Sequence, residues 1–181
     1  TGSKKESNFH VVDSEYRGLA ALDAVTAIVI AEGYATADTL SQALSCPVVA
    51  AFDSGNLLKV AQVLQKKYPQ KPIVIAGDDD LTQESINGKN PGKEKAMEAA
   101  QLVNGAVVLP IFAPGEQMSQ QLSDFNDLAN KSVLGIEAVK RQVGSVVEKV
   151  SQQAKQDSLL KLQVPIEPKQ QEIKQKRALV R

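Results

Sequence analysis

The chain has 181 residues, 43% of them hydrophobic and 23% charged, which suits one ordinary soluble domain with an appendage. One cysteine, Cys46, and one histidine, His10, exclude an internal disulfide, a cysteine-ligated zinc site and a histidine-rich centre, so any metal must have oxygen ligands. The net charge of zero hides an asymmetry, because residues 1–130 carry 10 Lys and Arg against 16 Asp and Glu, whereas residues 131–181 carry 11 against 5.

The first 24 residues read as a polar lead-in to the folded part of the chain. No apolar run approaches the roughly 20 residues that cross a bilayer, and no signal peptide is apparent. We therefore expect a cytoplasmic protein with no membrane span. The polar start over residues 1–8 looks like a cut inside a longer protein or a cloning remnant, so other domains of a longer chain are expected partners.

Four short runs rich in β-branched residues predict strands that are buried on both faces. They cover residues 27–31 (AIVIA), 48–52 (VVAAF), 73–76 (IVIA) and 106–109 (AVVL). Between the runs, apolar side chains recur at helical spacing. Strands that alternate with helices predict an α/β fold over residues 25–130, with a parallel sheet of about four strands flanked by helices.

A C-terminal amphipathic helix is predicted over residues 131–160. Valines and other apolar residues between positions 136 and 154 fall on one stripe, which we expect to pack on the core. Pro165 ends regular structure, and residues 161–181 read as a flexible basic tail. A solvated tail is favoured over one that contacts DNA or leads into another domain.

Carboxylates follow three of the predicted strands. Glu32 comes directly after the first strand, Asp53 after the second, and Asp78, Asp79 and Asp80 after the third. Parallel strands place these side chains at one edge of the sheet, where ligands gather. Crowded like charges are costly unless a cation lies among them, so the pattern predicts a divalent metal site. In an extended segment Asp78 and Asp80 face the same way, and Asp79 faces elsewhere.

Single acids after strands are also common as turn formers and helix caps. Asp53, which precedes a Ser-Gly-Asn segment, is therefore predicted to cap a helix rather than to bind metal. Asp79 is predicted to be exposed. For Glu32, Asp78 and Asp80 taken together, the metal site is favoured.

The order of these motifs resembles that of the Toprim domain, and most of all the primases of conjugative plasmids and mobile elements. The segments EGYATA from Glu32, FDSGNL and IVIAGDDD are similar to the pattern of that group. Residues 124–128 (DFNDL) resemble the element after the last Toprim strand, and residues 90–100 (NPGKEKAMEAA) resemble the helix start after the Asp-x-Asp loop. The resemblance covers residues 25–130 and implies a Rossmann-like Toprim fold.

The resemblance also implies an activity, which is nucleotidyl or phosphoryl transfer with Mg²⁺ or Mn²⁺ as cofactor and with nucleotides and single-stranded template DNA as partners. Asp78 and Asp80 would bind the metal, and Glu32 would be a ligand or the general acid or base, with a raised pKa. The further candidates are Asp124 and Asp127 as metal ligands or ordering residues, Asn126 as an orienting residue, and Lys89, Lys93 and Lys95 as phosphate contacts. A loop hydrogen bond for Asn126 and a solvated helix face for the lysines are equally favoured.

Two departures from bacterial-type primases keep other functions open. The chain cannot form their zinc-binding domain, and only about 25 residues precede the first strand, too few for a template-gripping subdomain. Aromatic residues are few, which predicts no stacking platform for single-stranded nucleic acid. We expect the Toprim domain of a primase-like protein from a conjugative plasmid or mobile element, such as a relaxase-primase. The alternatives are a Toprim nuclease and a non-catalytic DNA- or partner-binding module within a larger relaxase.

Overall fold

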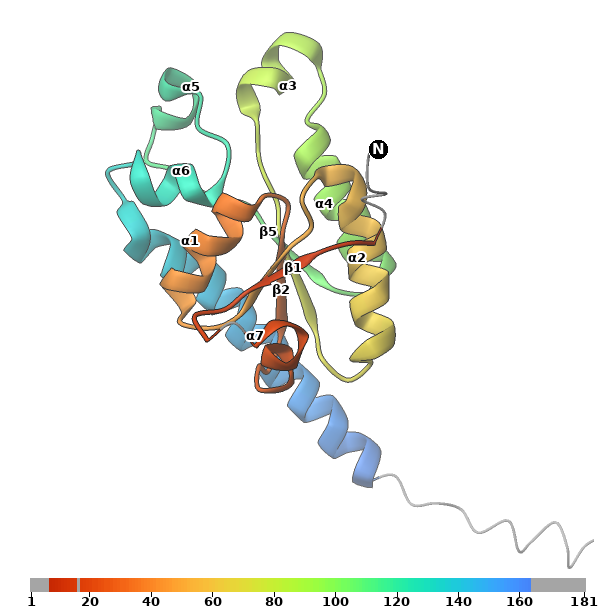
Figure 1. Ribbon diagram of the computed structural model, residues 1–181. Coiled ribbons are helices and arrows are strands. Elements are labelled where there is room, and N and C mark those ends of the chain that lie inside the picture. Colours follow the sequence, from red (N-terminus) through yellow and green to blue (C-terminus); the bar gives the residue numbers. More distant parts are fainter. Residues whose placement is uncertain (1–6, 16, 164–181) are drawn as a thin grey trace, which may run out of the picture.

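In the computed structural model, which describes residues 7–15 and 17–163, five strands form one sheet in the order β1-β3-β2-β4-β5 (Figure 1). The strands are β1 (His10–Val12), β2 (Ile28–Ala31), β3 (Val48–Ala50), β4 (Ile73–Ala76) and β5 (Ala106–Val108). Strands β2 to β5 run parallel, and β1 lies antiparallel to β3 at the edge.

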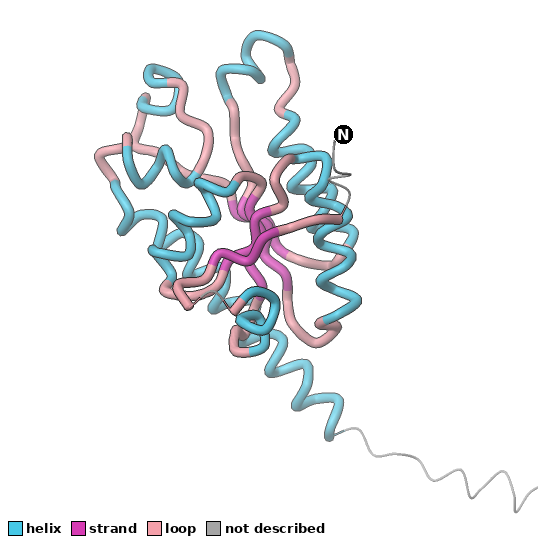
Figure 2. Tube along the Cα trace, viewed as in Figure 1, coloured by secondary structure: helices cyan, strands magenta, loops and turns pink. Residues whose placement is uncertain are grey.

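Helices cover both faces of the sheet (Figure 2). Their bounds are η1 (Gly18–Asp23), α1 (Tyr34–Leu44), α2 (Ser54–Lys67), α3 (Leu81–Asn87), α4 (Pro91–Leu102), α5 (Glu116–Gln120), α6 (Phe125–Asn130) and α7 (Gly135–Gln163). Helices α2 and α4 pack on one face with η1, and α1, α6 and α7 pack on the other. Helices α3 and α5 stand beyond the carboxyl ends of the strands (Figure 1).

The central strands are buried along their whole length, as their apolar runs predict. Every residue of β2 and β4 is buried. Within β2, Val29 and Ala31 face the α1 and α7 side, whereas Ile28 and Ile30 face α2 and α4. Each fully buried valine or isoleucine side chain of these strands contributes about 1.5–3 kcal/mol to folding. This packing holds the carboxyl ends of β2 and β4 in register, since Ala31 pairs with Ala76.

The predicted α/β fold with a parallel sheet of about four strands is confirmed, since β2 to β5 run parallel, and a fifth strand is added antiparallel at the edge. The additional strand, β1, lies in the predicted lead-in and pairs His10 with Ala50. Its three residues are too few to show the alternation of an edge strand, so the sequence does not reveal it. Three residues of the predicted lead-in, His10–Val12, are therefore part of the sheet.

The predicted C-terminal helix corresponds to α7, which lies along one face of the sheet and then extends beyond the domain (Figure 1). Val139 and Val143 of its stripe are fully buried, whereas Ile136 is 41% exposed. No helix in the described part of the chain is long and apolar enough to cross a membrane. Most of the predicted basic tail, residues 164–181, lies outside the described residues.

Gly77 directly follows β4 and precedes the acidic loop, at a point where the chain packs closely against α4. A Cβ atom at this position would lie 2.5 Å from Cβ of Ala96 and 3.0 Å from Cδ2 of Leu109. We expect Gly77→Ala to lower the free energy of unfolding by about 2 kcal/mol, because the crowded layers must separate. Denaturant unfolding measures this change. The matched control is Gly144→Ala in α7, where the nearest atom would be 3.8 Å away.

Unlike Gly77→Ala, the control substitution should not destabilise the chain. Alanine favours a helix over glycine by up to about 1 kcal/mol, so Gly144→Ala should leave stability unchanged or raise it. Equal destabilisation by both substitutions would contradict the close packing at Gly77.

Candidate metal centre

The structure brings the predicted acidic residues to one edge of the sheet. Glu32 follows β2, Asp53 precedes α2 after β3, and Asp78 follows Gly77 after β4. Because β2 lies between β3 and β4 and all three run parallel, their carboxyl ends are adjacent. The loops that carry the acids therefore converge, as the sequence predicts.

Gly92, in the first turn of α4, shows how closely Asp78 and Glu32 approach each other. A Cβ atom built there would lie 3.1 Å from Cβ of Asp78 and 3.6 Å from Oε2 of Glu32. The missing side chain thus lets the start of α4 fit against both carboxylates. The N–H groups at this helix start also favour negative charge beside them.

Asp78 is the most perturbed acid of the group. Its Oδ1 is buried and has no hydrogen-bond partner among the described residues. Its pKa is raised from 3.8 to about 7, mainly by burial and then by the negative charges of Glu32, Asp124, Asp127 and Asp80, in that order. A buried carboxylate oxygen without a hydrogen-bond donor is unusual, because its charge is costly to bury. Binding of a proton or a cation would offset that cost.

Glu32 lies in the same environment. Burial raises its pKa, and the charges of Asp53 and Asp124 act in the same direction. A backbone N–H of Ser54 donates to the carboxylate and partly opposes the rise. The sequence prediction of a raised pKa for Glu32 is therefore confirmed, with burial as the main cause rather than the neighbouring acids.

Three other acids cap helices with one carboxylate oxygen each. Asp53 accepts from the backbone N–H of Asn56 at 2.9 Å, Asp80 from Gln83 at 2.8 Å and Asp124 from Asp127 at 2.7 Å. The cap predicted for Asp53 is thus confirmed. Asp124 also accepts from Oγ1 of Thr36 at 3.1 Å through its second oxygen. The caps fix where these carboxylates lie relative to Asp78.

Asp127 and Asn126 make contacts that hold α6 in place. Asp127 is buried, accepts from the backbone N–H of Ser123 at 3.0 Å and pairs with Nζ of Lys131 at 2.7 Å. Asn126 accepts from Oγ1 of Thr39 at 2.9 Å. In this arrangement Asn126 joins α6 to α1 by a hydrogen bond. The sequence favoured such a bond and orientation of a carboxylate equally.

Asn90 anchors the acidic loop and was not identified from the sequence. Its side chain is 2% exposed, and Nδ2 donates to Oδ1 of Asp79 at 2.8 Å and to Oε2 of Glu84 at 3.0 Å. Its Oδ1 accepts from the backbone N–H of Asp80 at 3.3 Å. An Asn before Pro91 is a helix-start signal, but the bonds back to the loop depend on the tertiary fold.

Asp79 is not exposed, in contrast to the sequence prediction. Besides Asn90, its side chain lies 3.4 Å from Nζ of Lys93, and 13% of its surface remains accessible. Its backbone N–H donates to Ser123, and its carbonyl accepts from Nε2 of Gln117 at 2.6 Å. The loop between β4 and α3 is thereby joined to α5 and to the start of α6.

The three candidate lysines lie on or near α4. Lys93 pairs with Asp79 and, at 3.9 Å, with Glu84, and Lys95 pairs with Glu98 at 2.6 Å. Lys89 is exposed in the turn before α4. Two of the three thus have carboxylate partners within the chain, so phosphate binding by these lysines stays a prediction.

The donor set suits a divalent cation, but the carboxylates are not gathered around one point. Oxygen ligands, a negative cluster and the buried Oδ1 of Asp78 fit Mg²⁺ or Mn²⁺. Within residues 7–15 and 17–163, however, no three acidic, histidine or cysteine side chains lie close enough to hold one ion as they stand. Coordination by three side chains therefore needs side-chain rotation, which mutual repulsion opposes until a cation binds.

Comparison with known proteins supports the resemblance seen in the motifs. A family profile for the Toprim domain matches residues 27–133. Two Escherichia coli proteins named DNA primase TraC are 39% identical to the chain, one over 85% and the other over 97% of it. The chain spans only 14% and 22% of the length of these two relatives. No solved structure matches it significantly.

Proposed function

This chain belongs to the Toprim domain family, and on that basis we propose that it is the nucleotidyl-transfer domain of a primase-like protein. The longer protein would come from a conjugative plasmid or mobile element and would act in the cytoplasm on single-stranded DNA and nucleotides. Similarity to the two primases named TraC supports this assignment.

The observation that carries the proposal is the buried, unpartnered Oδ1 of Asp78 within a group of carboxylates. A structural acid at this depth would have a hydrogen-bond donor or a basic partner, as Asp127 has in Lys131. Asp78 instead faces other acids, which is the arrangement expected of a ligand to Mg²⁺ or Mn²⁺.

In this proposal Asp78 binds the ion first, and Asp80 and Asp124 complete the site once their side chains have rotated. A bound divalent ion would polarise the attacking hydroxyl and offset charge on the phosphate. Glu32 would be either a further metal ligand or the group that takes the proton from the hydroxyl, a role that suits its raised pKa. Asp127 and Asn126 keep α6 and its capping Asp124 in position, and Lys89, Lys93 and Lys95 would meet the phosphates.

Primer synthesis by the 181-residue chain tests the proposal. With single-stranded template, ribonucleotides and Mg²⁺ or Mn²⁺, we expect metal-dependent oligonucleotide products and a loss of at least about a hundredfold on Glu32→Gln. Glu148→Gln, an exposed change of the same kind in α7, serves as the matched control and should leave the rate unchanged. Primer synthesis that is equal in both variants would contradict the assignment.

Two other outcomes would select the alternatives. Nicking of plasmid DNA without nucleotides, abolished by Glu32→Gln, would indicate a Toprim nuclease. Absence of both reactions, together with no binding of metal, would indicate a non-catalytic module.

A further inference from the structure

Among the described residues, every exposed aromatic side chain lies at the edge of the sheet where the acids gather. Tyr34 is 51% and Phe52 is 44% exposed, and His10 is also exposed. Tyr34 begins α1 after β2, Phe52 follows β3, and His10 pairs with Ala50 at the end of β3. The remaining described aromatic residues are buried or partly buried, namely Phe9, Tyr68, Phe112 and Phe125.

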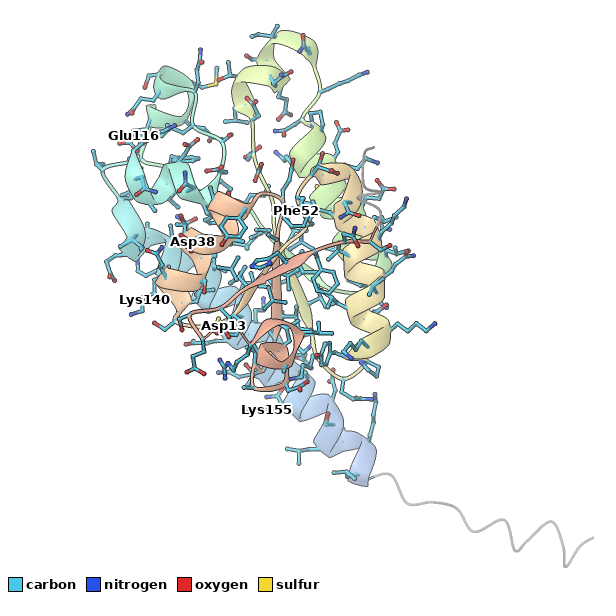
Figure 3. The ribbon with its side chains drawn as sticks, viewed as in Figure 1. Asp13, Asp38, Phe52, Glu116, Lys140 and Lys155 are labelled. Carbon is cyan, nitrogen blue, oxygen red and sulfur yellow. The ribbon has the colours of Figure 1, made fainter. Side chains whose placement is uncertain are left out.

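Phe52 is held in a backbone conformation that a bulky residue rarely adopts. Its φ is 74°, in the left-handed region, and the other described non-glycine residues there are all polar: Ser7, Ser45, Asn104 and Gln121. A glycine at position 52 would remove the strain and the exposed apolar ring together. The turn itself therefore does not require a phenylalanine, and strain of this kind is characteristic of functional positions. Figure 3 shows Phe52 at the sheet edge between α1 and α2.

The aromatic residues and the acids are parts of the same loops. The backbone N–H of Ala51 donates to the carbonyl of Ala31 at 2.9 Å, which aligns the loop of Phe52 with the loop of Glu32. Ser54, two residues after Phe52, donates to the Glu32 carboxylate. Tyr34 lies two residues after Glu32, and its ring centroid is 5.6 Å from that of His10. A single extended ligand can therefore contact both the rings and the acids.

We propose that Phe52, Tyr34 and His10 form a stacking surface for the bases of single-stranded DNA whose phosphates lie at the acid cluster. The inference rests on the proposed function and names how its nucleic acid is bound. Every base has a flat π-face, so stacking on such rings binds a strand with little regard to sequence. The low aromatic content predicts no such platform, but the fold gathers the few exposed rings at one place.

Binding of two fluorescent 12-mers to the full chain tests this inference, one of oligodeoxythymidylate and one of abasic residues with the same phosphates. The wild type should bind the thymidylate strand about tenfold more tightly. Phe52→Gly and Phe52→Ala should reduce this ratio towards one, whereas Phe52→Trp should keep it. Val63→Ala, which trims an exposed apolar side chain elsewhere on α2, is the control. A melting temperature of Phe52→Gly close to that of the wild type would separate lost stacking from misfolding, because glycine accepts the positive φ without strain.

The ratio is measured with Mg²⁺ and again in EDTA, so that it can be judged apart from the metal site. If the acids bind metal, EDTA should weaken binding of both strands and leave their ratio unchanged. The chain could prefer the thymidylate strand in a way that depends on Phe52 and yet neither bind metal nor make primers. That result would contradict the proposed function and support the stacking surface. The inference would be overturned if the wild type bound the two strands equally or bound neither of them. It would also be overturned if Phe52→Gly kept the wild-type ratio of the two affinities.

Discussion

Replacing Asp78 with asparagine should abolish metal-dependent nucleotidyl transfer and make the metal-free chain more stable at neutral and higher pH. Loss of a metal ligand at the reacting centre should lower the rate by at least about a hundredfold. The stabilisation follows because a buried carboxylate among like charges is replaced by a neutral amide of nearly the same shape. We expect a gain of about 2 kcal/mol, since the amide still lacks a full set of hydrogen bonds.

Urea unfolding in EDTA and primer synthesis measure the two effects on the same protein preparations. Asp157→Asn in the exposed part of α7 makes the same chemical change outside the site and should alter neither quantity. If Asp78→Asn lost activity only in proportion to lost stability, Asp78 would be a structural residue. If Asp78→Asn gained stability and lost activity, the negative charge of Asp78 would be shown to serve metal binding at a cost in stability.

The stability of the metal-free chain should fall as the pH rises from about 4 to about 7. In this window the folded chain holds more protons than the unfolded chain, because the pKa of Asp78 is about 7 when folded and near 3.8 when exposed. At about 1.4 kcal/mol per pKa unit, the loss is at most about 4 kcal/mol, and solvent screening reduces it. The raised pKa of Glu32 acts in the same direction.

The difference between wild type and Asp78→Asn isolates this effect from other titrating groups. Asp13 and Glu116, for example, have lowered pKa values, so their contributions are lost as the pH falls. Urea titrations across the window in EDTA should give a difference that grows up to about pH 7 and then levels off. Millimolar Mg²⁺ should remove most of it, since a bound cation favours the ionised carboxylate. Parallel curves for the two proteins would show that Asp78 is not perturbed.

The sequence predicts those parts of this molecule that depend on local pattern. Buried strands such as β2 and β4 are continuous apolar runs, and parallel strands necessarily bring the residues after them to one edge. Glu32 and Asp78 were therefore identified correctly as neighbours. The order of the motifs also predicts the family, because each motif lies within one strand-loop-helix unit and is therefore visible as a local pattern.

Features that depend on tertiary contacts were not predictable. The partners of Asn90 and the burial of Asp79 result from how α4 and α5 pack against the acidic loop. Strand β1 needs β3 as its partner, and its own three residues carry no periodic signal. Phe52 is exposed and has a positive φ, whereas its sequence context, a β-branched run, predicts a buried residue in a strand.

Calorimetric titration of Mn²⁺ into the wild type and Asp78→Asn at about pH 8, where Asp78 is mostly ionised, tests the central claim most directly. The wild type should bind Mn²⁺ at a site that Mg²⁺ competes for, and Asp78→Asn should lose that site. No binding to the wild type at millimolar concentrations, or equal binding by the two proteins, would contradict the assignment of the acid cluster as a metal centre.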